Sequence, residues 1–112
     1  MAINAFAKDL STGSYDLLVL DVLRDGRAYG YDIVKRIRIQ SHGMVTWHKG
    51  SLYRVLHDLE RRRWVVSVWS NARAGRRRRY YRLTPPGRRV WREQREQWRQ
   101  FARALNALLG LK

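Results

Sequence analysis

The amino-acid sequence predicts a mainly α-helical fold with one small β-hairpin. Three observations predict it: helical periodicity in three successive segments, two β-branched and aromatic segments around a turn, and a long uninterrupted helical pattern at the end. The 112 residues suffice for one domain, because two separate cores would be too small to offset the entropy of the chain.

The first helix is predicted over residues 14–24. Its apolar residues lie between positions 17 and 23, the Ser14 side chain suits an N-cap, and Asp16 suits the first turn. The pair Asp25-Gly26 is expected to end it. A second helix is predicted from Tyr29 to Gln40, with apolar residues at helical spacing on one side and basic residues on the other.

The third helix is predicted to begin after Gly50. Four apolar residues follow the i, i+3, i+4, i+7 rule, namely Leu52, Val55, Leu56 and Leu59. The side chains of Arg54, His57, Asp58 and Arg61 are then left on the outward face.

A β-hairpin with an arginine-rich tip is predicted next. Residues 65–70 and 79–83 have strand composition, and residues 71–75 supply the turn. Residues 61–82 contain nine arginines and no acid, so their mutual repulsion must be offset by something negative.

The final helix is predicted from Pro85 to Leu109, with Thr84 as its N-cap. Such a helix would be about 37 Å long. It carries a heptad seam, which predicts pairing with a second helix. The seam residues, and so the expected dimer interface, are Trp91, Gln94, Trp98, Phe101, Leu105 and Leu108.

Charge and composition limit the classes of partner and chemistry that are expected. The net charge is +15, and residues 33–112 hold 21 basic against four acidic groups, which favours a polyanionic partner. The chain has no cysteine, which excludes disulfides and thiolate chemistry. Its longest apolar stretch, residues 17–20, is too short to span a bilayer; we expect a cytoplasmic, nucleoid-associated protein.

Catalysis and metal binding are not expected. The basic part has few carboxylates, and no glycine-rich phosphate loop is present. The spacings of His42, His48 and His57 suit no common zinc motif, and His57 is as easily explained by a surface pair with Glu60. We therefore expect neither a metal site nor a cofactor.

Three short helices followed by a hairpin match the winged helix-turn-helix, in which the third helix enters the DNA major groove and the hairpin follows the phosphates. An arginine on the helix can recognise a guanine through two hydrogen bonds. Arginines on the hairpin bind phosphates, which adds affinity but no sequence specificity. The alternative is that the polar face of the third helix is merely solvated. The residues expected to contact DNA are His48, Lys49, Ser51, Tyr53, Arg54, His57, Arg73, Arg76, Arg77 and Arg78.

Several short segments resemble, in their order, the PadR family of bacterial transcriptional regulators. They are Tyr29-Gly30-Tyr31-Asp32-Ile33, then Gly50 to Leu56 with Leu59-Glu60, then Arg79 to Thr84 before Gly87. The likeness covers about residues 13–109 and is to the short subfamily, with one C-terminal dimerisation helix. It implies DNA contacts by Ser51, Tyr53 and Arg54.

The resemblance also implies a domain plan and an effector. Residues 1–84 would form the DNA-binding domain with its N-terminal helix, and residues 85–112 the dimerisation helix, in one structural unit. Some family members are repressors released by small aromatic molecules, and Trp98 matches the aromatic residue that flanks their effector, with Tyr15 and Phe6 as candidate neighbours. We expect a homodimer on a palindromic operator, since two-fold symmetry implies one.

Two departures from the family pattern bear on geometry. Arg63 stands where the family usually has glycine, and Pro85-Pro86 replaces an acidic pair. In a left-handed cap, Arg63 would cost about 1 kcal/mol more than glycine.

Two other classes of protein remain as alternatives. A nonspecific architectural or RNA-binding basic protein would share the charge and bind all duplexes alike. A membrane-surface helix would share the aromatic and basic residues of the final helix, although its narrow seam suits helix pairing better.

Overall fold

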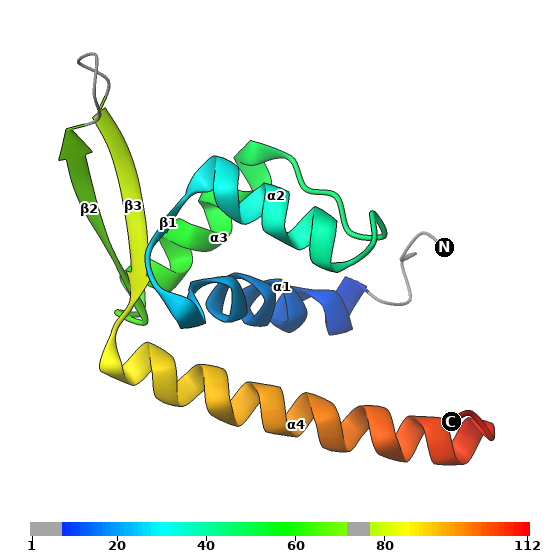
Figure 1. Ribbon diagram of the computed structural model, residues 1–112. Helices are drawn as coiled ribbons and strands as arrows, with labels where there is room; N and C mark the ends of the chain where they lie inside the picture. Colours follow the sequence, from blue (N-terminus) through cyan, green and yellow to red (C-terminus); the bar gives the residue numbers. More distant parts are fainter. Residues whose placement is uncertain (1–7, 72–76) are drawn as a thin grey trace.

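A computed structural model describes residues 8–71 and 77–112. In chain order the elements are α1 (Lys8–Val22), the 3-10 turn η2 (Leu23–Asp25), β1 (Ala28–Tyr29), α2 (Gly30–Gln40), α3 (Lys49–Arg61), β2 (Val65–Asn71), β3 (Arg77–Leu83) and α4 (Pro85–Leu109) (Figure 1). The predicted class, mainly helical with a small hairpin, is confirmed.

The predicted start of the first helix is wrong. α1 begins at Lys8, so Ser14 lies inside the helix and is not its N-cap. The apolar signal starts only near Leu17, and the small polar residues before it are typical of caps and turns, although a continuing helix accommodates them at little cost. The end agrees with the prediction: Gly26 has a φ of 142° and follows η2.

The hairpin is part of a three-stranded antiparallel sheet with the order β1-β3-β2. β2 and β3 pair from Val65 opposite Leu83 to Asn71 opposite Arg77. The two-residue strand β1, which the sequence did not predict, pairs on the other side of β3, with Ala28 opposite Tyr81. The extra strand ties the base of the hairpin to the start of α2.

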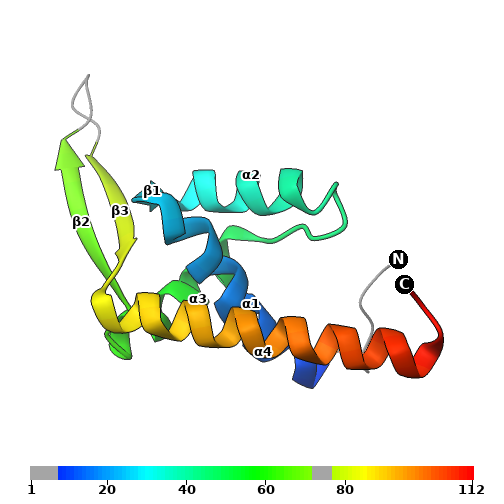
Figure 2. The same ribbon diagram turned by 60° about the horizontal axis from the view of Figure 1, so that its bottom comes forward.

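The core is formed by α1, α2, α3 and the base of the sheet. Its largest fully buried side chains are Leu20, Leu23, Ile33, Leu52, Leu56, Leu59, Val19 and Val65. No polar or charged residue among those described is buried in it. Burying such side chains contributes about 1.5–3 kcal/mol each. α1 lies between the pair α2–α3 and the long helix α4 (Figures 1 and 2).

α3 ends in a left-handed cap formed by an arginine. Arg63 has a φ of 64°, its N–H donates to the Glu60 carbonyl, and the Trp64 N–H donates to the Leu59 carbonyl, each at 3.0 Å. This is the Schellman arrangement. The common geometry is therefore kept despite the absence of glycine, and β2 starts directly after it.

α4 begins and ends as the sequence predicts. Thr84 accepts the Gly87 N–H at 3.0 Å through its hydroxyl oxygen, which donates in turn to the Arg63 carbonyl at 2.7 Å. The Thr84 N–H donates to the Trp64 carbonyl. Gly87 is required here, because a Cβ would lie 1.9 Å from the Trp64 oxygen. One threonine thus caps α4 and joins it to the end of α3.

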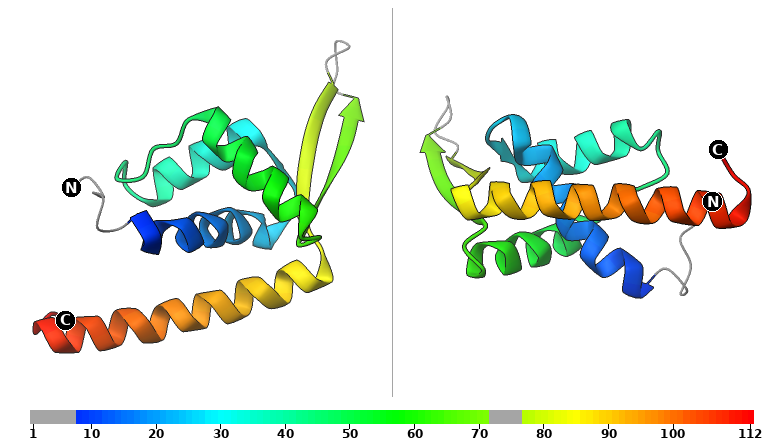
Figure 3. Two further views of the ribbon diagram at one scale, coloured as in Figure 1. Left: turned by 180° about the vertical axis from the view of Figure 1, so that it is seen from behind. Right: turned by 90° about the horizontal axis from the view of Figure 1, so that it is seen from below.

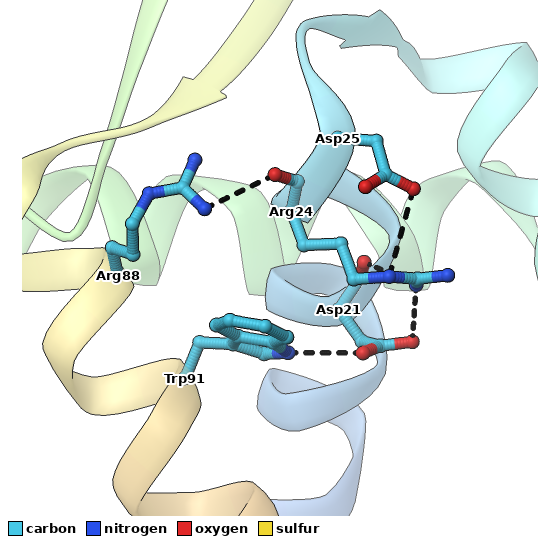
Figure 4. Close-up of polar contacts among 5 residues, drawn as sticks. All are labelled: Asp21, Arg24, Asp25, Arg88 and Trp91. Atoms are coloured by element: carbon cyan, nitrogen blue, oxygen red, sulfur yellow. Dashed lines mark hydrogen bonds and ion pairs between the residues drawn. The ribbon is translucent and has the colours of Figure 1, made fainter.

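A polar cluster fixes α4 against α1 (Figure 4). The indole N–H of Trp91 donates to Asp21 Oδ1 at 2.9 Å, and Arg24 pairs with Asp21 Oδ2 at 2.7 Å. Arg88 donates to the Arg24 carbonyl at 3.1 Å. The first two turns of α4 are therefore anchored within one chain.

Candidate nucleic-acid interface

The outward face of α3 carries most of the side chains predicted to contact DNA. His48, Lys49, Tyr53, Arg54 and His57 are exposed and Ser51 is half-buried. The helix starts at Lys49, slightly before the predicted start, and its N-cap His48 makes no side-chain capping bond. The first backbone N–H groups of α3 therefore remain available to an acceptor such as phosphate.

The hairpin presents arginines stacked on aromatic rings. Arg78 lies over the Tyr29 ring at 4.7 Å and Arg77 over the Trp69 ring at 5.1 Å, measured to the ring centroid. Stacking of this kind holds a guanidinium in place without neutralising it. Two other predicted contacts, Arg73 and Arg76, lie outside the described residues.

The sequence did not predict the role of Glu60. Instead of pairing with His57, Glu60 accepts the Ser67 hydroxyl at 2.5 Å and pairs with Arg79 at 3.1 Å. These bonds join the last turn of α3 to both strands of the hairpin, which lies beside it (Figure 3). Arg79 is therefore held by a carboxylate. Only the alternation of side chains along β3 hinted that Arg79 differs from Arg78.

α3 and the hairpin meet at a hollow of about 360 Å³. Tyr53 of α3 lines it together with Arg77 and Arg78 of β3. Gly30, at the start of α2, permits this approach, because a Cβ there would lie 2.7 Å from the Tyr53 hydroxyl oxygen. Three predicted DNA-contact residues, distant in sequence, are thus brought to one place.

The acids near this face are already paired. Asp58 contacts Arg61 at 2.6 Å and Arg62 at 3.1 Å, and Glu60 holds Arg79. Among the described residues, no carboxylate pairs with Arg54, Arg77 or Arg78, whose side chains are exposed. The surface formed by α3 and the hairpin is therefore strongly positive, as phosphate binding requires.

Comparison with known proteins decides the family. Residues 19–93 match the model described as the transcriptional regulator PadR-like family. The chain belongs to the PadR-like family. Members of this family regulate transcription and bind DNA, so the protein is a winged-helix DNA-binding regulator and not an enzyme.

Two solved structures of transcriptional regulators and one curated protein are similar to this chain over most of its length. A transcriptional regulator from Clostridium thermocellum is 29% identical with a TM-score of 0.80, covering 95% of this chain and 97% of its own. A PadR family regulator from Eggerthella lenta is 34% identical with a TM-score of 0.76, covering 94% and 89%. An uncharacterised protein of Lysinibacillus sphaericus is 23% identical over 101 residues, which is 90% of this chain and 93% of that protein.

In this PadR-like regulator, the second half of the α4 seam is exposed to an unusual degree. The exposed fractions are 45% for Trp98, 42% for Phe101, 41% for Leu105 and 83% for Leu108. The first two seam residues differ, since Trp91 bonds Asp21 and Gln94 is half-buried. Apolar exposure on this scale along one helix is typical of an interface.

A second hollow, of about 270 Å³, lies between α1 and α4. It is lined by Trp98, Leu17, Leu18, Asp21 and Arg95. The structure does not bring the predicted neighbour Tyr15 to Trp98 within one chain, because Tyr15 packs against Trp47 with ring centroids 4.8 Å apart. Phe6 lies outside the described residues.

The part of the PadR-like chain that the structure describes holds neither a cluster of metal ligands nor a membrane-spanning helix. No group of three or more His, Cys, Asp or Glu side chains there is arranged to hold a metal ion. No helix in residues 8–71 and 77–112 combines the length and the apolar character that crossing a membrane requires.

Proposed function

We propose that this PadR-like regulator is a homodimeric repressor that binds a palindromic operator on the nucleoid. In each protomer, α3 enters a major groove and the hairpin follows the adjacent phosphates. The observation that carries the proposal is the meeting of Tyr53, Arg77 and Arg78 at one hollow between helix and hairpin. If the polar face of α3 were merely solvated, it would not need to meet the arginines of the hairpin in this way.

The proposed contacts divide into those that recognise bases and those that bind phosphates. Tyr53, Arg54 and His57 face outward beyond the first turn of α3, where side chains reach base edges. His48, Lys49 and Ser51 lie at its start, where phosphate is the natural partner. The hairpin set, Arg73, Arg76, Arg77 and Arg78, supplies affinity that does not depend on sequence.

Dimerisation is assigned to residues 85–112, and residues 1–84 form the DNA-binding part. The exposed seam residues of α4 are expected to be covered by the same surface of a second copy, since a two-fold interface is self-complementary. Successive major grooves lie about 34–36 Å apart. The pairing of two α4 helices therefore sets the spacing between two copies of α3.

A small aromatic effector is proposed at the hollow beside Trp98. Asp21 is already engaged by Trp91 and Arg24, so Arg95 is the charged group there without a carboxylate partner among the described residues. Tyr15 and Phe6 are retained as candidate neighbours from the second protomer. Binding at this place would act on the angle between α1 and α4.

Selection of bound fragments from genomic DNA, followed by sequencing, tests the DNA part. Fluorescence anisotropy with the selected duplex then compares Arg54→Ala with Arg78→Ala. Arg54→Ala is expected to lose about 1–3 kcal/mol of discrimination between operator and random duplex. Arg78→Ala is expected to weaken binding to the operator and to random duplex equally. Arg89→Ala on α4 serves as the control. Equal binding of the parent protein to every sequence would instead favour the architectural alternative.

Sedimentation equilibrium tests the dimer. Trp98→Ala removes a large part of the exposed seam and is expected to weaken the dimer by about 1–3 kcal/mol. Gln97→Ala, on the neighbouring exposed position of α4, is the control. A monomeric parent chain at micromolar concentration would refute this arrangement. A reporter gene placed downstream of the selected operator distinguishes repression from activation.

A further inference from the structure

A third hollow lies on a different face of α1 from Trp98. Its volume is about 660 Å³, within the range of small-molecule sites, about 300–1,000 Å³. It is lined by α1, by the segment that leads into α3, and by α3 itself. Figure 3 shows these two helices side by side when the molecule is seen from behind. The hollow therefore borders the helix that is proposed to read DNA.

One wall of this hollow is aromatic. Tyr15 and Trp47 pack together with their ring centroids 4.8 Å apart and their planes inclined by 46°. Both rings are half-buried, and Val55 extends the apolar surface beside them. Such a wall offers ring faces and edges against which a planar aromatic molecule can pack in a stacked or edge-to-face arrangement.

Most of the other side chains in the wall of the hollow are charged, and three arginines, Arg54, Arg61 and Arg62, outnumber the two carboxylates of Asp16 and Asp58. Asp58 is neutralised by Arg61 and Arg62. Burial raises the pKa of the Asp16 carboxyl above its usual value, and the nearby Arg62 acts against that shift. Arg54 and His57 also line the hollow, and no carboxylate of the described chain pairs with Arg54. An anionic group is the complement of this wall.

We propose that the hollow binds a planar aromatic anion, and that the bound anion excludes DNA directly. Exclusion follows because Ser51, Arg54 and His57 both line the hollow and belong to the proposed DNA contacts. The exclusion rests on that proposed function, whereas the binding of the anion does not. An aromatic acid and a free nucleotide share the required chemistry, a flat ring with one anionic group.

The expected regulation differs from that of a ligand beside Trp98. A ligand that occupies DNA-contact residues competes with DNA, so the apparent Kd for DNA rises in proportion to ligand concentration without reaching a limit. A ligand between α1 and α4 acts through the dimer geometry, and its effect saturates at the coupling free energy. The two mechanisms are therefore separable by titration.

The test uses the full chain and two matched pairs of probes. One pair is 2-naphthoate with the neutral 2-naphthalenemethanol, and the other is adenosine 5′-monophosphate with adenosine. Equilibrium dialysis measures affinity, and the indole N–H signals of Trp47 and Trp98 in NMR spectra locate the probe. Variants are Trp47→Phe, which keeps an apolar ring, and Arg54→Gln at an exposed position. Trp98→Phe is the control in the other hollow, and thermal unfolding checks that each variant is folded.

The proposal expects at least one anion to bind about tenfold more tightly than its neutral partner. The Trp47 signal should shift, Trp47→Phe and Arg54→Gln should weaken binding about tenfold, and Trp98→Phe should leave it unchanged. Which anion binds identifies the source, acid or nucleotide.

Several results would overturn the site: no binding of either anion, equal binding of the neutral partners, or binding that depends on Trp98 alone. A saturating effect on DNA affinity would overturn the exclusion. If the anion binds at Trp47 while Arg54→Gln leaves DNA affinity unchanged, the site stands and the DNA role proposed for Arg54 is wrong.

Discussion

We expect the carboxylate of Glu60, which pairs with Arg79, to determine whether Arg79 is available to DNA. The substitution Glu60→Gln keeps an oxygen that accepts the Ser67 hydroxyl but removes the charge that holds the Arg79 guanidinium at 3.1 Å. Arg79 then becomes a free cation beside Arg78 on the same strand. We expect the variant to bind DNA with a steeper dependence on salt than the parent chain, because one more counterion is released from the DNA.

The magnitude follows from one added phosphate contact. Each contact steepens the slope of log K against log salt by about 0.9, so a fourfold rise in salt costs the variant about threefold more affinity than the parent. The loss of folding stability is small, about 0.5–1 kcal/mol, since the side chains of Arg79 and Glu60 are 40% and 29% exposed and water screens their attraction.

Fluorescence anisotropy with an operator duplex at several salt concentrations measures the slope. Arg79→Ala is the matched variant: alone it should leave the slope unchanged, and combined with Glu60→Gln it should cancel the increase. Arg78→Ala, which should flatten the slope by about 0.9, is the positive control. If Arg79→Ala alone flattened the slope as much as Arg78→Ala does, Glu60 would not withhold Arg79 and the reasoning would be refuted.

Three further substitutions test the fold. Gly87→Ala is expected to destabilise the protein by about 3 kcal/mol in thermal unfolding, because its Cβ would overlap the Trp64 carbonyl oxygen. Arg63→Gly is expected to raise the free energy of unfolding in urea by about 1 kcal/mol, since glycine adopts the φ of 64° without strain. Asp16→Asn is expected to raise the melting temperature at pH 7. Burial raises the pKa of Asp16 above 3.8, so the folded state binds its proton more tightly than the unfolded state does. The free energy of unfolding therefore falls as pH rises from 3.8 through the native pKa. The variant has no carboxyl at this position and lacks this fall.

Matched controls accompany these three. Gly50→Ala meets no atom within 4 Å in α3 and should stabilise the fold, so equal losses at Gly50 and Gly87 would contradict the overlap. Arg62→Gly, at a φ of −78°, should destabilise, and a gain there would show that left-handed strain is not the cause. Gln97→Ala, on an exposed position of α4 without a titratable side chain, should leave the pH profile of melting unchanged, and a profile for Asp16→Asn that matched the parent's would contradict the role of burial.

Local chemistry was sufficient for much of the fold. The bounds of α4 follow from Thr84, Pro85 and the absence of a later proline. The hairpin and the end of α2 likewise depend on residues within a few positions of each other. The exposed face of α3 was predicted from periodicity alone, because a helix fixes the direction of each side chain relative to its neighbours.

Contacts between distant residues were not predictable in this way. The strand β1 is too short for an alternating pattern, and it exists only because β3 offers a free edge to it. Glu60 found Ser67 and Arg79 instead of His57 because the left-handed turn at Arg63 folds β2 back beside α3. Family resemblance suggested Tyr15 as a neighbour of Trp98, and no local pattern indicated that within one chain Tyr15 packs against Trp47.

The sequence by itself determined that this protein is a basic, mainly helical regulator of the PadR type, because charge, periodicity and short motifs are properties of neighbouring residues. The tertiary structure alone decided which of the described arginines pair with a carboxylate, and which hollows lie beside α3. These depend on pairs such as Asp21 and Trp91, which are 70 positions apart in the chain. Such pairs form only when the whole core has packed, so no local pattern records them.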